Sequence, residues 1–169
     1  MDAFGEMLGV THFDTIKFFH QGLKEVSVGR NVTPETKVYI ASILADFAQT
    51  PRGEDLTVAT PTNLAEIFDA FVLSRLIGKP TRPSPELLEV AGARCLLVNG
   101  FFRDYMRRRH SVEWFDKLGS SFYDQAGSYQ KKAEKRSFLK EIAGDFSNLA
   151  ETCSALNKHL QESKYLLQL

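Results

Sequence analysis

Hydroxyl–proline pairs stand directly before apolar stripes at three places in the chain. They are Thr33-Pro34, Thr60-Pro61 and Ser84-Pro85. The hydroxyl oxygen can accept a hydrogen bond from the first N–H groups of a helix, and proline at the first helical position lacks only an N–H that would have no partner. Each pair therefore predicts the start of a helix.

Apolar residues after these starts, and in the other apolar segments of the chain, recur at spacings of three and four. No long window alternates apolar and polar residues as a half-buried strand does. The sequence therefore predicts an all-α, single-domain bundle of about six or seven helices with an aromatic-rich core. The expected helices cover about 14–26, 34–50, 61–76, 85–100 and 112–126, and two further segments follow with apolar stripes at 138–146 and 149–160.

The length of 169 residues and the hydrophobic fraction of 43% suit one domain spanning 1–169. The strongest break in the helical pattern covers residues 78–83. If the chain divides into two subdomains, we expect the boundary there. The chain has no apolar run long enough for a membrane span. Its 21 basic and 21 acidic residues balance, which argues against coating a polyanion through bulk charge.

Both cysteines, Cys95 and Cys153, fall within apolar helical patterns. Two cysteines are too few for a disulfide-stapled secreted scaffold, so buried thiols are the favoured interpretation, although a disulfide stays formally open. The first residues are acidic where an export signal needs basic residues and an apolar run. We therefore expect a cytoplasmic protein.

Local motifs for catalysis, cofactors and metals are missing. The chain has no glycine-rich phosphate loop, no CxxC or HExxH motif, and no histidine three positions after a glutamate. Gly119-Ser120-Ser121 lies in a helical context rather than at a strand-to-helix elbow. We expect no cofactor and no metal.

One basic segment stands apart from this background. Five arginines and a single acid, Asp104, lie between Arg94 and His110, and aromatic residues flank them. Arginine beside aromatic rings can hold a carboxylate or phosphate and stack on planar ligands. The alternative is that the aromatic residues are core and the arginines cover a helix end. The candidate ligand-binding residues are Arg103, Arg107, Arg108, Arg109, Trp114 and Tyr123.

Three functions follow from these patterns, in order of preference. The first is a non-enzymatic domain that binds a protein or a small anionic ligand through the arginine segment. The second is an enzyme whose dispersed polar residues meet in a pocket, with Tyr123, Glu113, Asp116 and His110 in acid–base roles. The third and least favoured is a nucleic-acid module that adds Lys131, Lys132, Lys135 and Arg136 to the arginines.

The segment from Leu96 to Tyr123 resembles a family of uncharacterised bacterial helical proteins with an "LFxSGFFP…RR…DYYxxMGxxAY" core. The resemblance is carried by Leu96-Leu97-Val98-Asn99-Gly100-Phe101-Phe102, Arg107-Arg108-Arg109, Trp114-Phe115, Gly119 and Tyr123. Arg103 stands where the family has proline, and Trp114-Phe115 replaces a tyrosine pair. The resemblance implies a helical fold in a bacterial cytoplasm, and it implies no activity.

Overall fold

The computed structural model describes residues 11–49 and 84–166, and the regular structure within these ranges is entirely helical. The all-α prediction is therefore confirmed. The helix expected over 61–76 and the break at 78–83 lie outside the described residues. The described elements are α2 (His12–Val26), α3 (Pro34–Gln49), α5 (Pro85–Leu96), the π-helical turn η1 (Leu97–Phe101), α6 (Arg103–Arg107), α7 (Val112–Tyr129), α8 (Ala133–Gly144) and α9 (Phe146–Leu166).

Hydroxyl caps fix several of the helix starts. The Oγ1 of Thr33 accepts from the Thr36 N–H at 3.3 Å, and the Oγ of Ser84 accepts from the Leu87 N–H at 3.2 Å. Helix α2 begins two residues earlier than the expected Asp14, because Asp14 is the third helical residue of a capping box whose hydroxyl is supplied by Thr11. The caps at Thr33 and Ser84 are therefore where the sequence predicts them, whereas the cap at Thr11 was not predicted.

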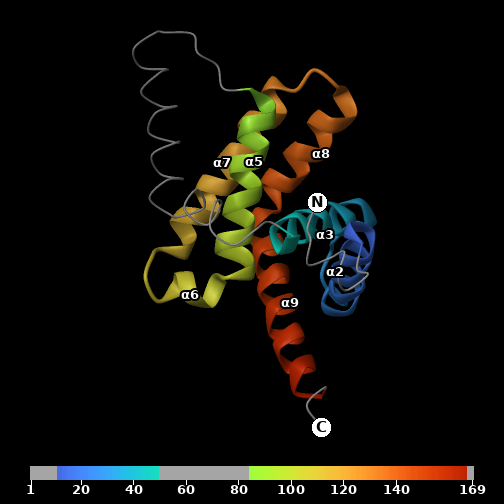
Figure 1. Cartoon of the computed structure of the whole chain (residues 1–169). Helices are drawn as coiled ribbons and strands as arrows, with labels where there is room; N and C mark the ends of the chain where they lie inside the picture. The colour runs from blue at the N-terminus through green and yellow to red at the C-terminus, as the bar shows by residue number, and fades with distance from the viewer. Residues whose placement is uncertain (1–10, 50–83, 167–169) are drawn as a thin grey trace.

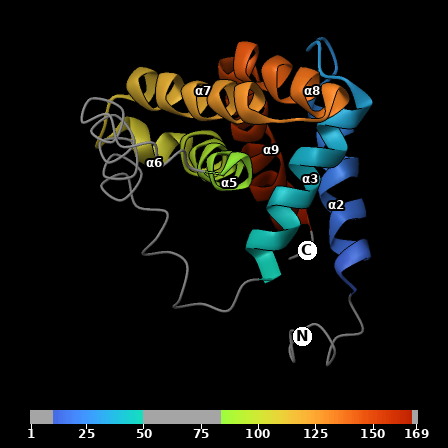
Figure 2. The same cartoon turned by 90° about the horizontal axis from the view of Figure 1, so that it is seen from above.

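The helices form two groups joined by α9. Helix α7 packs against both α5 and α8 (Figures 1 and 2). Helix α6 lies at the lower end of α5 (Figure 1). The α2–α3 hairpin packs on the other side of α9 (Figure 1). Apolar residues of both groups belong to one hydrophobic core, with Leu23 and Ile40 from the hairpin and Leu88 and Leu139 from the other helices.

The hairpin is fastened to α9 by close packing and by charge. A side chain at Gly22 would come within 2.6 Å of the Leu156 side chain, so glycine there lets α2 approach α9 closely. Nε2 of His159 lies 2.6 Å from Oε2 of Glu25, and Nη1 of Arg30 lies 3.8 Å from Oε2 of Glu151. The N-terminal helices are therefore held by the last described helix.

Aromatic residues fill the core around α7. Phe122, Tyr123 and Phe146 are at most 2% exposed, and Phe115 is also buried. The predicted aromatic-rich core is confirmed. The closest approach is at Gly119, where an added Cβ would overlap Cζ of Phe146 and would lie 2.5 Å from Cε2 of that ring and 2.9 Å from Cβ of Cys95.

The α5 helix passes into a π-helical turn before it ends. The Phe102 N–H donates to the carbonyl of Leu97 at 3.3 Å, five residues back. At Gly100 an added Cβ would lie 3.0 Å from Cβ of Cys153 and 3.1 Å from Cα of Ala150. The backbone of this turn therefore lies directly on α9. A glycine within an apolar helical pattern, such as Gly100, indicates a close approach of this kind.

Both cysteines are buried and unbridged. Burial raises the pKa of Cys95, with a further contribution from the nearby Asp116 carboxylate, and burial alone raises the pKa of Cys153 to about 12. Because the thiolate is the reactive form, we expect both thiols to be inert in the folded protein. The native protein should react with 5,5′-dithiobis(2-nitrobenzoate) at least ~10³-fold more slowly than the denatured protein does. The reason is that the thiols become accessible only through unfolding, which costs about 5 kcal/mol. Rapid labelling of the native protein would contradict this burial.

Candidate functional site

A buried ion pair joins α6 to α7. The Arg103 guanidinium donates from Nη1 to Oδ1 of Asp116 at 3.1 Å and from Nη2 to Oδ2 at 3.0 Å. Both side chains are 8% exposed. Two parallel N–H···O bonds of this kind are the strongest geometry that arginine forms with a carboxylate.

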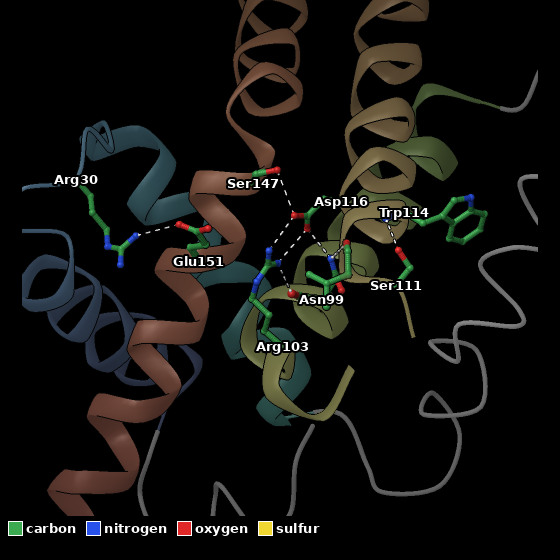
Figure 3. A network of polar contacts seen from close by, with 9 residues as sticks. Arg30, Asn99, Arg103, Ser111, Trp114, Asp116, Ser147 and Glu151 are labelled. Carbon is green, nitrogen blue, oxygen red and sulfur yellow. Dashed lines mark hydrogen bonds and ion pairs between the residues drawn. The ribbon is translucent and has the colours of Figure 1, made fainter. Parts of the chain in front are cut away.

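The π-helical turn supplies further partners for this pair. Nη1 of Arg103 also donates to the Asn99 carbonyl at 3.0 Å, and the Asn99 amide donates to Oδ1 of Asp116 and to the Val112 carbonyl. Ser147, at the start of α9, donates to Oδ2 of Asp116 at 3.2 Å (Figure 3). The network thus ties η1, α6, α7 and α9 together.

Two polar atoms of the network have no hydrogen-bond partner among the described residues. They are Oδ1 of Asn99 and Nε of Arg103, both fully buried. Neither residue borders one of the hollows described below. The Asn99 and Arg103 side of the network is therefore internal, whereas Asp116 and Ser147 also border a groove on α7.

A wide groove of about 780 Å³ lies where α7 meets the α8–α9 junction. Its charged lining residues are acidic except for Lys117. Ser120, which lines the groove, donates to the Ala143 carbonyl at 2.7 Å, and Lys140 is paired with Asp124. The acidic residues that line the groove are Glu113, Asp116, Asp124 and Asp145.

A smaller pocket of about 240 Å³ lies between α6 and α9, and we call it the α6–α9 pocket. Its residues are of three kinds. The charged ones are Asp104, Arg108 and Lys158, the aromatic ones are Phe101, Phe102 and Tyr105, and the neutral polar ones are Ser154, Asn157 and Gln161.

Hydrogen bonds within the α6–α9 pocket orient some of these groups. Nε of Arg108 donates to the Asp104 carbonyl at 3.3 Å, one helical turn back. The Asn157 amide donates to the Phe101 carbonyl at 2.6 Å, and Gln161 donates to Oδ1 of Asn157 at 3.0 Å. The end of the π-helical turn is therefore attached to the pocket wall on α9.

The ligand-binding residues expected from the sequence are spread over several environments. Arg103 is buried in its pair with Asp116, whereas Arg107, Arg108 and Arg109 are exposed at the end of α6. The Arg109 guanidinium lies over the Tyr105 ring, 4.5 Å from its centre. Of these four arginines, Arg108 alone borders a pocket described above.

The two aromatic candidates lie apart from each other. Trp114 is 45% exposed and points away from the buried network (Figure 3). Tyr123 is fully buried, and its hydroxyl lies 3.1 Å from that of Tyr39. The expected set therefore does not form one site.

Tyr123 instead belongs to a polar chain that runs from the core to the surface. The Tyr39 hydroxyl donates to Glu89 at 3.2 Å, and Glu89 is paired with Lys135 at 3.0 Å. Burial raises the pKa of both tyrosines, so both hydroxyls are neutral donors at physiological pH. This chain links α3, α5, α7 and α8.

The groups expected for the two alternative functions are also separated. Glu113 and Asp116 border the groove, but His110 and Tyr123 do not. Lys131 and Arg136 follow the end of α7, whereas the arginines precede its start, and the 18 residues of α7 span about 27 Å. The structure therefore does not bring the two basic segments into one surface.

Ser154 and Lys158 were missed as site residues from the sequence. Both belong to α9, and their spacing of four residues places them on one face of that helix. This spacing is common on solvent-exposed helices, so it does not by itself indicate a site. The two residues line a pocket only because α9 packs against α6.

Within the described ranges, no three histidine, cysteine, aspartate or glutamate side chains are grouped so that they could hold a metal ion. Among the same residues, no helix combines the length and apolar character needed to cross a bilayer. Comparison of the chain with protein-family models, curated proteins and solved structures finds no match to any of them.

Proposed function

We propose that the protein is a non-enzymatic binding domain for a small anionic ligand, and that the ligand occupies the α6–α9 pocket. One observation carries the proposal. Arg108 from the end of α6 and Lys158 from α9 border the same pocket, although they are 50 positions apart in the chain. Arginine and lysine side chains that border one pocket can bind an oxyanion there through charge-assisted hydrogen bonds.

The arrangement of Arg108 supports this function. Its Nε donates a hydrogen bond to the Asp104 carbonyl, and its two terminal nitrogens have no hydrogen-bond partner among the described residues. The bond from Nε holds the guanidinium plane in place, so these nitrogens form a fork suited to an oxyanion. Arg103 contributes no charge to a ligand, because Asp116 neutralises it.

One side chain of the pocket, the Asp104 carboxylate, disfavours anion binding. The Asp104 carboxylate lies 3.9 Å from Nζ of Lys158, and both groups are more than half exposed. Asp104 therefore weakens the field of the lysine at the pocket. This pairing provides a substitution that should strengthen binding rather than weaken it.

Acetate and inorganic phosphate are the probes for this function, and NMR shifts of the amides of 101–108 and 154–161 are the measurement. Arg108→Gln and Lys158→Gln should each weaken binding of the better probe about 10-fold, as loss of a charge-assisted hydrogen bond of about 1.5 kcal/mol does. Asp104→Asn should strengthen it by about 2- to 5-fold, since it removes a like charge.

Arg107→Gln is the matched control, because it removes the same charge from the same helix outside the pocket. Its effect should be less than about 2-fold, since charges outside the pocket are screened by salt. Equal losses in Arg107→Gln and Arg108→Gln would show that the anions respond only to overall charge, and would overturn the proposed site.

We also propose a bacterial, cytoplasmic setting and membership of the helical family whose core motif the segment from Leu96 to Tyr123 resembles. The state of the cysteines supports the compartment, since both thiols are unbridged and such thiols are typical of reducing compartments. Expression of a fluorescent fusion in a bacterium, followed by fractionation, tests this. Recovery in the periplasm would contradict it.

A further inference from the structure

We propose that the ligand of the α6–α9 pocket is a small monocarboxylic acid with a single aromatic ring. This inference rests on the proposed function and narrows it to a ligand class. It is carried by three features of the pocket: its net charge, its aromatic wall and the hydroxyl group of a largely buried serine.

The charge of the pocket matches a carboxylate better than a phosphate ester. Two cations, Arg108 and Lys158, and one acid, Asp104, give a net charge of +1 (2 − 1) for its lining residues. A carboxylate with one negative charge neutralises this lining. A phosphate monoester carries about −1.5 to −2 at pH 7 and would leave negative charge beside Asp104.

The shape of the cationic group points the same way. The fork of Arg108 lies in a plane fixed by its bond to the Asp104 carbonyl. A carboxylate is planar and accepts two parallel bonds from such a fork. The Lys158 ammonium acts as a point charge and demands no particular shape.

Aromatic rings form the wall beside these charges. The rings of Phe101 and Phe102 meet edge to face with centroids 5.2 Å apart, and Phe102 packs in the same way on Phe47 of α3 at 5.7 Å. The contact with α3 holds the wall in position. A further aromatic ring packs favourably on such edges and faces, which an aliphatic acid cannot match.

Size restricts the body of the ligand to one ring. The volume of about 240 Å³ lies below the range of roughly 300–1,000 Å³ usual for drug-sized ligands. A single ring with a short acid arm suits this space.

The hydroxyl group of a largely buried serine marks a position for a polar substituent on the ring. Ser154 is 8% exposed and borders the pocket, and its Oγ forms no hydrogen bond with any described residue. Its neighbour Asn157 is already engaged with Phe101 and Gln161. The buried polar atoms that lack a partner among the described residues do not include this oxygen, so it is open to the pocket and is placed to bond a hydroxyl group on the ligand.

The test compares phenylacetate, phenyl phosphate and 2-phenylethanol as probes on the unaltered protein by isothermal titration at pH 7.5. Phenylacetate should bind about 10-fold tighter than each of the others, and tighter than acetate, because it alone supplies both the single charge and the ring. 4-Hydroxyphenylacetate should gain about another 5-fold from Ser154. Ser154→Ala should remove that gain, so that 4-hydroxyphenylacetate and phenylacetate bind the variant equally.

Asp104→Asn separates charge matching from other causes. It raises the net charge of the lining residues from +1 to +2, so phenyl phosphate should gain more affinity than phenylacetate and the preference should shrink or reverse. Tighter binding of phenyl phosphate by the unaltered protein would overturn this inference and leave the anion-binding function standing. Equal binding of acetate and phenylacetate would do the same. Failure of every anion to bind would overturn both.

Discussion

The Arg103→Met variant is expected to unfold with a free energy about 3 to 5 kcal/mol lower than the unaltered protein. Methionine keeps much of the length of the side chain but leaves the Asp116 carboxylate buried without its bidentate partner. The bonds from Asn99 and Ser147 would remain, but neither residue carries a compensating positive charge. Urea denaturation followed by circular dichroism measures the difference.

A second variant keeps this result interpretable if Arg103→Met does not fold. Arg103→Met combined with Asp116→Leu removes both charges, and replacing a buried pair by apolar groups is often neutral or stabilising. The double variant should therefore recover most of the lost stability. As a control, Lys140→Met breaks the more exposed pair with Asp124 and should cost less than about 1 kcal/mol. A double variant no more stable than the single one would contradict a dominant role for the unpaired charge.

Substitution of Gly119 by alanine should lower the free energy of unfolding by about 1 to 3 kcal/mol. Alanine favours helices over glycine by about 1 kcal/mol, so the sign of the effect depends on the space available. The new methyl group would overlap Cζ of Phe146, lie 2.5 Å from Cε2 of the same ring and lie 2.9 Å from Cβ of Cys95, so the buried Phe146 ring would have to shift. Thermal denaturation of the variant should show a lower midpoint.

Gly144→Ala is the matched control for this substitution. Gly144 is the last residue of α8, and no atom lies within 4 Å of the position that its Cβ would take. The change should therefore be neutral or stabilise the protein by up to about 1 kcal/mol. If both alanine variants were equally stable, the close packing of α7 on Phe146 would be refuted.

The helices of the described ranges could be predicted well because their signals are local. Thr33, Ser84 and Ser111 each cap the helix that follows them, as the sequence indicates. The pairing of Arg103 with Asp116 could not be chosen in the same way. The two residues lie on different helices, α6 and α7, and their pairing depends on how the π-helical turn positions α6. No local sequence pattern predicts that position.

The candidate site was harder to predict for geometrical reasons. Trp114 and Tyr123 are nine residues apart on α7, which places them on opposite sides of a helix at about 100° per residue. One ring is therefore exposed and the other buried. Arg108 could be picked out from the arginine cluster, but its partners Ser154 and Lys158 come from a helix far along the chain. Their role appears only once α9 packs against α6.

The attachment of the α2–α3 hairpin to α9 has a consequence for synthesis on the ribosome. The hairpin is made first, but the residues that cover it, Glu151, Leu156 and His159, are made close to the end of the described chain. At roughly 5–20 residues per second, translation of residues 50–145 takes on the order of 5–20 s. During that time the apolar face of the nascent hairpin lacks its partner helix. We therefore expect chaperones to bind this segment co-translationally and to leave once α9 has emerged.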